Sequence, residues 1–210
     1  MNEKSTYQTS KKSTYQTIKK PVNDVLFKDR GSKFSGDAFP VKNEDDVKKR
    51  LAEIQEKQSK ANHHCYAYSL GYDEAYIRYN DDGEPSNSAG KPIYGQIYGF
   101  DITDVLVVVT RYFGGTKLGV GGLIHAYKTT AKLCLNEAKI IEKEITKQLE
   151  VRCEYEQMNE VLKLVKKEDL TIIDQELQLK CRYVLAINVD QFTAIKNQFE
   201  LLKGIKVKEL

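Results

Sequence analysis

Residues 111–122, RYFGGTKLGVGG, combine glycines with cationic and aromatic side chains. An apolar run at 105–110 precedes them, and a helix-like pattern at 123–141 follows. Backbone N–H groups at the start of such a helix lack partners and carry the positive end of the helix dipole, so this order favours an anion. The predicted site for phosphate or nucleic acid comprises Arg111, Tyr112, Gly114, Gly115, Lys117, Gly119, Gly121 and Gly122, together with Lys91.

This stretch fits neither common nucleotide-binding motif. Val120 stands where a P-loop needs lysine, and Ile124 replaces the third glycine of the dinucleotide-binding pattern. The alternative interpretation is structural: Gly114–Gly115 would form a tight turn, and Gly119–Gly122 would let the helix approach the sheet closely. Both interpretations stay open from the residues alone, and no cofactor is predicted.

A second polar segment, NDDGEPSNSAGKP at 80–92, could hold an acid–base pair or a small ligand. The spacing of its carboxylates does not match a calcium loop, and its serines lack the surroundings of a nucleophile. Turn-forming residues explain most of its composition. The candidate polar residues are Asp81, Asp82, Glu84 and Ser86, with His63 or His125 as acid–base partner.

The histidines and cysteines give little support for a metal. His63 and His64 are adjacent in a predicted strand and therefore point to opposite faces, whereas His63 and Cys65 share a face. The four cysteines are widely spaced within apolar patterns, which is typical of buried free thiols in a reducing compartment. We expect no metal site.

The elements that would position these residues form a first predicted domain at 21–141. Polar segments separate apolar runs of strand length, and apolar residues at helical spacing mark two longer segments. The segment 92–100 is ambiguous because two glycines interrupt it. Strands are predicted within 25–41 around a turn at 29–31 and at 65–72, 75–80 and 104–113, and helices at 43–61, capped by Asn43, and 120–141.

Residues 142–210 have a different pattern and form a second predicted domain. Strands alternate with helices in the order βαββαβ, with strands at 147–157, 170–189 (a pair with a turn near 175–176) and 205–210, and helices at 158–168 and 190–204. This order is typical of a ferredoxin-like fold. The domain contains no polar cluster of catalytic type, so we interpret it as a packing or binding module.

Charge is concentrated in the first 20 residues, which we predict to be a disordered basic tail. The whole chain of 210 residues carries a net charge of +3, but this tail holds five lysines and one glutamate. The tail also repeats KSTYQT at 4–9 and 12–17. The remaining 28 basic and 29 acidic residues nearly balance, so a nucleic-acid surface on the folded body must be a local patch.

Apolar runs are too short to cross a membrane, and no secretory leader is present, so we expect a cytoplasmic protein without a membrane partner. No DNA-specific motif is present either.

The segments NDDGEPSNSAGKP and VVVTRYFGGTKLGVGGL, with GSKF, AFPV and HHCYAYSLG before them, resemble the YigZ/Impact family. The resemblance implies an α+β fold of two domains. The first would be an Impact-type α/β sandwich with a left-handed βαβ crossover, similar to domain four of elongation factor G, and the second would be ferredoxin-like.

The resemblance also implies a link to translation, because the eukaryotic relative Impact is a translational regulator that competes for protein contacts. We therefore predict a binding protein that contacts RNA or the ribosome through the glycine-rich loop. The alternatives are a small-anion-binding protein or hydrolase that uses residues 81–88, and an adaptor with a protein partner. No known reaction comes with the family, and we do not predict an enzyme.

Overall fold

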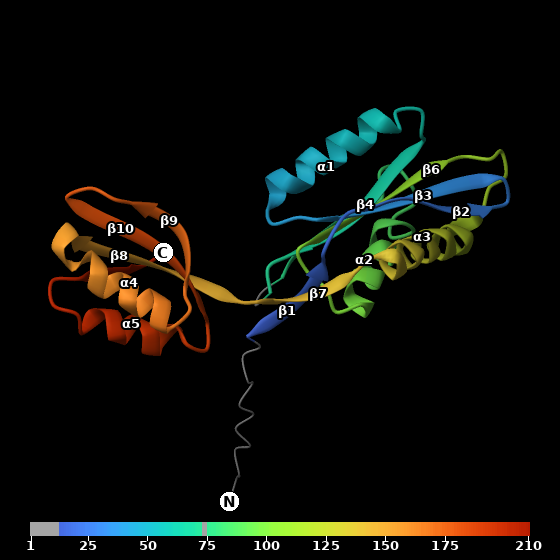
Figure 1. Cartoon of the computed structure of the whole chain (residues 1–210). Coiled ribbons are helices and arrows are strands. Elements are labelled where there is room, and N and C mark those ends of the chain that lie inside the picture. The colour runs from blue at the N-terminus through green and yellow to red at the C-terminus, as the bar shows by residue number, and fades with distance from the viewer. Residues whose placement is uncertain (1–12, 73–74) are drawn as a thin grey trace, which may run out of the picture. The chain divides into compact units, whose positions relative to one another are not determined.

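The computed structural model describes residues 13–72 and 75–210, so most of the predicted tail, including one copy of its repeat, lies outside the described residues. Two compact units share the chain (Figure 1). The first unit is Tyr15–Lys143, and the second is Glu144–Leu210 together with Ser13 and Thr14. The boundary predicted near 141–142 stays a proposal about how the chain folds.

The first unit contains a five-stranded sheet in the order β2-β3-β6-β4-β5. Its neighbouring strands are antiparallel, so β3 and β4 run parallel on either side of β6. The strands are β2 (Val22–Asp29), β3 (Ser32–Pro40), β4 (His63–Leu70), β5 (Tyr76–Asn80) and β6 (Val105–Tyr112). The predicted central strand is confirmed, because β6 is buried on both faces.

Helices cover both faces of this sheet (Figure 1). Helix α1 (Glu44–Lys57) packs on Leu106 and Val108, whereas α2 (Gly90–Gly99) and α3 (Gly119–Glu137) pack on the face of Val107. Asn43 caps α1 as predicted, since its side chain accepts the Asp46 N–H at 2.8 Å. The connection from β3 through α1 to β4 is the predicted crossover, and its hand stays a prediction.

Part of the tail that the sequence predicts to be disordered forms a strand in a two-stranded sheet. Strand β1 (Thr14–Ile18) pairs with β7 (Ile140–Glu144), and Thr17 and Ile18 are buried. Residues 14–18 are therefore not disordered. Their polar composition hides the strand because its partner comes from the far end of the unit. The long helix likewise ends at Glu137, since Ala138 adopts an extended backbone that leads into β7.

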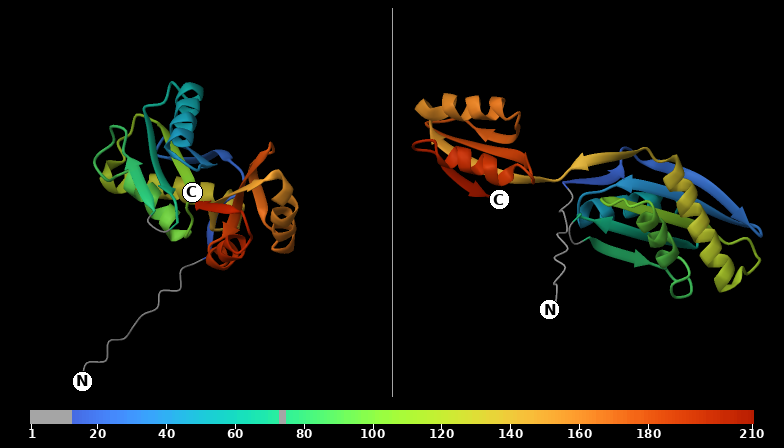
Figure 2. Two further views of the ribbon diagram at one scale, coloured as in Figure 1. Left: turned by 90° about the vertical axis from the view of Figure 1, so that its left-hand side faces the viewer. Right: turned by 90° about the horizontal axis from the view of Figure 1, so that it is seen from below.

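The second unit has the predicted βαββαβ order and forms a four-stranded sheet in the order β11-β8-β10-β9. Both helices cover one face, where their apolar side chains join a single core with the strands (Figure 2). This is the ferredoxin-like arrangement. Its elements are β8 (Thr146–Glu154), a 3-10 turn at Tyr155–Gln157, α4 (Met158–Lys167), β9 (Thr171–Glu176), β10 (Lys180–Asn188), α5 (Phe192–Glu200) and β11 (Lys206–Glu209).

Two local predictions are refined. The turn between β9 and β10 falls at 177–179, later than predicted, and the ambiguous segment at 92–100 is helical as α2. None of the helices in the described part of the chain combines the length and hydrophobicity that a membrane span needs.

Candidate functional site

The segments 80–92 and 111–122 meet at one end of the first unit's sheet, which we call the signature end. The contact is an ion pair in which Arg111 Nη1 donates to Glu84 Oε1 at 2.6 Å. The two side chains are only 6% and 4% exposed, so the pair lies inside the protein. The predicted adjacency of the two segments is confirmed at this pair.

Further partners surround the Arg111–Glu84 pair. The Tyr127 hydroxyl of α3 donates to Glu84 Oε1 at 2.8 Å, and the Arg111 guanidinium lies 5.5 Å from the ring centres of both Phe34 and Phe113. Arg111 Nη2 also lies 3.4 Å from Ser32 Oγ. Arg111 therefore stabilises the interior of the unit, and this geometry does not favour the direct phosphate contact that the sequence predicts.

The aspartates of the polar loop have structural roles. Asp81 accepts the N–H groups of Asn87, Ala89 and Gly90 at 2.8–3.0 Å, which satisfies the start of α2. Asp82 Oδ2 accepts the His64 N–H at 2.6 Å. With Glu84 bound to Arg111, each predicted carboxylate is engaged within the unit, so the geometry gives no support to an acid–base pair here.

The structure brings only one of the two candidate histidines to this loop. His63 Nδ1 lies 2.7 Å from the Asp82 carbonyl oxygen, and His63 Nε2 lies 3.9 Å from Glu84 Oε1. His125 is exposed elsewhere on α3, with its ring 6.2 Å from that of Phe27, so its predicted place at this loop is wrong. Ser86 is exposed, and its hydroxyl accepts a hydrogen bond from the neighbouring Asn87 side chain.

Strand β4 shows the predicted alternation. Cys65 faces the loop, and its thiol donates to the Asp81 carbonyl at 3.0 Å, whereas His64 Nε2 lies 3.2 Å from the Gln58 carbonyl on the α1 side. Burial raises the pKa of the Cys65 thiol, and burial also raises the pKa of the Tyr127 hydroxyl. Both groups are therefore protonated at neutral pH, which argues against a nucleophilic role.

Some glycines of the 111–122 stretch fit the structural interpretation, whereas others fit the interpretation as an anion site. A Cβ atom on Gly114 would lie 1.9 Å from the Gly31 carbonyl carbon, so this glycine serves close backbone packing. A Cβ atom on Gly122 would contact Leu118 at 3.0 Å. Gly115, Gly119 and Gly121 differ, because a Cβ atom at any of them would point into open space, with no atom of the described residues within 4 Å apart from the adjoining backbone.

The start of α3 carries the exposed part of the predicted anion site. This helix has no side-chain cap, and Lys117 just before it is exposed. Lys91 is exposed in the first turn of α2, which also begins at the signature end. Tyr112 points toward α1, where its hydroxyl lies 3.5 Å from Gln58 Oε1, so Phe113, 48% exposed, is the aromatic side chain available at the loop.

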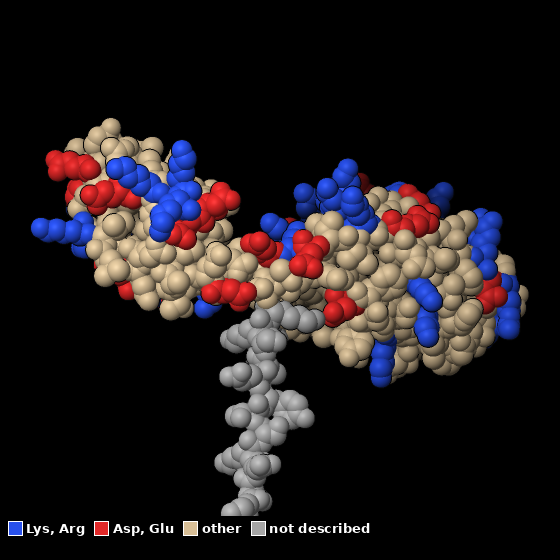
Figure 3. Space-filling view, turned by 60° about the horizontal axis from the view of Figure 1, so that its bottom comes forward, with Lys and Arg blue, Asp and Glu red and all other residues tan. Residues whose placement is uncertain are grey.

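The four cysteines are buried and free, as predicted. The described residues contain no group of three or more ligating side chains that could hold a metal. In Figure 3 both cationic and anionic side chains are scattered over the face that is seen, and one group of cationic side chains gathers on the first unit.

Tyr127 is the residue of this cluster that sequence reasoning missed. It is fully buried on the apolar face of α3 and bonds to Glu84. A buried tyrosine hydroxyl requires a polar partner, so its place in an apolar helical stripe was a usable signal.

Comparison with known proteins identifies the family. The model of the Impact N-terminal domain matches residues 30–135, which include both segments of the signature end. The chain belongs to the Impact family. An Impact family member of Haemophilus influenzae is 30% identical over 85% of this chain and 88% of its own length. YvyE of Bacillus subtilis is 35% identical over 59% of this chain and 57% of that protein.

A solved structure extends the similarity of this Impact-family chain to both units. The crystal structure of a hypothetical protein aligns with a TM-score of 0.75 at 25% identity, covering 95% of this chain and 98% of that one. The Impact homologue of Saccharomyces cerevisiae is 33% identical over 48% of this chain, a match that spans 40% of the yeast protein. The two-domain fold is thus shared over 95% of the chain, whereas similarity to this eukaryotic relative covers about half of it.

Proposed function

We propose that this Impact-family chain acts in translation or its regulation, and that the signature end of its first unit contacts RNA phosphate. The observation that carries the proposal is the start of α3. It combines an uncapped helix N-terminus, glycines in open space and the exposed Lys117. Unpaired N–H groups and a helix dipole favour phosphate at such a position.

The buried Arg111–Glu84 pair fixes the position of the segments that form this surface. It joins the end of β6 to the loop before α2, so the starts of α2 and α3 are held at one end of the sheet. Lys91 and Lys117 then supply exposed charge, and Phe113 supplies an exposed ring for base stacking. The combination is suited to a single strand of RNA rather than to sequence-specific reading of a duplex.

The link to translation rests on the family. The first unit is expected to be similar to an elongation-factor domain, and the eukaryotic relative Impact is a translational regulator. Only 34% of the Xenopus laevis protein Impact is matched by this chain, so the activity of that longer protein is a guide to the process and not to the contacts.

The test is RNA binding by the double variant Lys91→Gln/Lys117→Gln. We expect weaker binding of a single-stranded RNA oligonucleotide and a slope of log affinity against log salt that is shallower by about 1.4, because two phosphate contacts are lost. Fluorescence anisotropy over a salt series measures both quantities. The matched control is Lys48→Gln/Lys132→Gln, which removes two exposed lysines from the helices α1 and α3. Wild-type protein that fails to bind RNA at low salt, or equal binding by the two double variants, would contradict the proposal.

An adaptor role is the second candidate, favoured by the edge of the same sheet. Strand β5 is the last strand, and Tyr76, Ile77 and Tyr79 on it are 38–46% exposed. Tyr98 on α2 is 75% exposed, and Tyr94 stacks on Tyr79 and lies with its ring tilted against that of Tyr98. An exposed edge strand beside tyrosines suits the addition of a strand from a protein partner. A pull-down with this chain after nuclease treatment distinguishes the two roles. A protein partner that is still recovered in stoichiometric amount would favour the adaptor role over RNA binding.

A further inference from the structure

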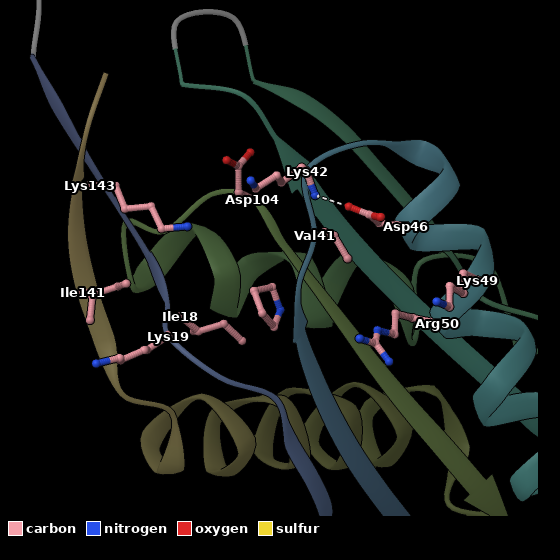
Figure 4. A pocket seen from close by; sticks show the side chains of 11 residues that line it. Ile18, Lys19, Val41, Lys42, Asp46, Lys49, Arg50, Asp104, Ile141 and Lys143 are labelled. Carbon is pink, nitrogen blue, oxygen red and sulfur yellow. Dashed lines mark hydrogen bonds between the residues drawn. The ribbon is translucent and has the colours of Figure 1, made fainter. Parts of the chain in front are cut away.

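The first unit contains a cavity of about 380 Å³ at the end of the sheet opposite to the signature end. Its walls are β1, β7, the segment that joins β3 to α1, the first turns of α1, and Asp104 before β6 (Figure 4). The signature end lies where β6 finishes, at Arg111, whereas this cavity lies where β6 begins. A ligand here would therefore be separate from one bound at the glycine-rich loop.

Cationic side chains dominate the lining of the cavity. Five cations stand against two carboxylates, and they come from four different segments. Figure 4 shows Lys42 and Lys143 extending toward the space from opposite walls, with the Arg50 guanidinium facing it from α1. The remaining two cations are Lys19 and Lys49.

Ion pairs within the described part of the unit neutralise only one of these five cations. Among the described residues, Arg50 is paired with Glu53 at 2.7 Å, whereas the four lysines have no carboxylate within 4.0 Å. The two carboxylates of the lining keep their negative charge, and each accepts a backbone N–H group. Asp46 accepts the Lys42 backbone N–H at 2.9 Å, and Asp104 accepts the Gly71 N–H at 2.9 Å.

Apolar side chains complete the cavity. Ile18, Val41 and Ile141 line it, and the first two are buried. Like charges that line one pocket repel one another, and a bound anion reduces that repulsion. The volume falls within the range of about 300–1,000 Å³ that is typical of pockets for small molecules. The cavity thus offers charge for a multivalent anion and apolar surface for an organic group attached to it.

We propose that this cavity binds a phosphate-bearing ligand of nucleotide size. Lys42 and Lys143, whose side chains extend toward the space in Figure 4, contact the phosphate, and the partly buried Ile141 contacts the organic part. A free nucleotide and the phosphorylated end of an RNA present the same chemistry, and the experiment below separates these two sources. The site does not depend on the function proposed for the signature end, because the two share no residue.

The test uses the full chain and the double variant Lys42→Gln/Lys143→Gln, in which glutamine keeps part of each aliphatic stem. The probes for isothermal titration calorimetry are ATP, adenosine, and a short single-stranded RNA with or without a 5′-phosphate, all without divalent cations. We expect ATP to bind the wild type, adenosine not to bind, and the variant to bind ATP about tenfold more weakly or worse, since hydrogen bonds from charged groups are lost. ATP should also raise the melting temperature of the wild type more than that of the variant.

The controls show which molecule carries the bound phosphate and where on the protein it binds. If only 5′-phosphorylated RNA binds, and the variant loses that binding, the phosphate belongs to an RNA end. Lys48→Gln/Lys132→Gln and Lys91→Gln/Lys117→Gln should leave ATP binding unchanged, so failure of the RNA proposal is visible independently of this one. Equal binding of adenosine and ATP, or equal ATP binding by the wild type and Lys42→Gln/Lys143→Gln, would overturn the proposal, and so would a wild type that binds neither ATP nor 5′-phosphorylated RNA.

Discussion

Glu84 accepts hydrogen bonds from the Arg111 guanidinium and the Tyr127 hydroxyl, although only 4% of its side chain is exposed. It therefore connects a loop, the end of β6 and α3 through one carboxylate. Removing one member of a buried ion pair leaves the other charge without compensation, and this costs much more than the pair itself contributes.

The variant Glu84→Gln should be destabilised by about 3–5 kcal/mol, because Arg111 would be a buried cation without a counter-charge. Urea unfolding followed by circular dichroism measures the loss. The control is Asp45→Asn, which breaks the exposed pair of Asp45 with Lys48 and should change stability by less than about 0.5 kcal/mol. A loss below about 1 kcal/mol in Glu84→Gln would show that Arg111 finds another partner.

At this scale the sequence predicts residue types better than it predicts contacts. The cysteines, the alternation in β4 and the Asn43 cap follow from local patterns and are confirmed. The Arg111–Glu84 pair joins residues 27 positions apart, and no local period predicts it. His125 was misplaced because it lies two residues before Tyr127 on a helix, and residues at that spacing point to different sides.

Strands β8 and β10 form a charged face on the second unit. Arg152 and Arg182 stand directly opposite each other in the ladder, and like charges in such positions repel. Glu150, with a side chain that is 9% exposed, accepts from both of them at 2.7–2.8 Å. Hydrogen bonds from these arginines lower the pKa of Glu150 from 4.5 to about 2.

This lowered pKa predicts an acid-dependent loss of stability in the second unit. The stabilisation is complete above pH 4.5, the pKa of the unfolded chain, and is lost as the pH falls toward the folded value of about 2. Glu150→Gln should therefore be less stable than the wild type at neutral pH. This difference in stability should vanish as the pH approaches about 2, the pKa of Glu150 in the folded unit. Hydrogen exchange of the β8 and β10 amides measures it. Glu160→Gln, an exposed control on α4, should show no such pH dependence.

Elements with strong local periods were predictable, and those fixed by distant partners were not. The central strand, α1 and the second unit's alternation of strands and helices carry their own hydrophobic patterns. Strands β1 and β7 are short and polar, and each is a strand because the other lies beside it. The glycines in α2 obscured a helix that Asp81 stabilises through tertiary contacts.

On the scale of the whole chain, each unit has hydrophobic clusters of its own among the described residues. The two clusters of the first unit use buried residues up to Leu135, and the cluster of the second begins at Leu149. Each unit thus buries its own apolar side chains, which is the physical requirement for independent folding.

A chain truncated after Glu144 should therefore fold, with the melting behaviour and dispersed amide spectrum of a packed domain. Truncation after Glu137 is the matched control. It removes β7 and leaves β1 without its strand partner. Its melting temperature should therefore be lower than that of the chain truncated after Glu144. Circular dichroism and two-dimensional NMR distinguish these outcomes. A truncated chain that ends at Glu144 but lacks a cooperative transition would show that the first unit needs residues of the second.

The position of β6 has a consequence for biosynthesis. It is the last of the five strands to leave the ribosome, yet it lies between β3 and β4 and contributes to both clusters of the first unit. Until it emerges, the hairpins β2–β3 and β4–β5 have no shared core and expose apolar side chains. The nascent first unit must therefore acquire its structure in one late step, and a stall before residue 105 leaves a chain that chaperones or proteases would recognise.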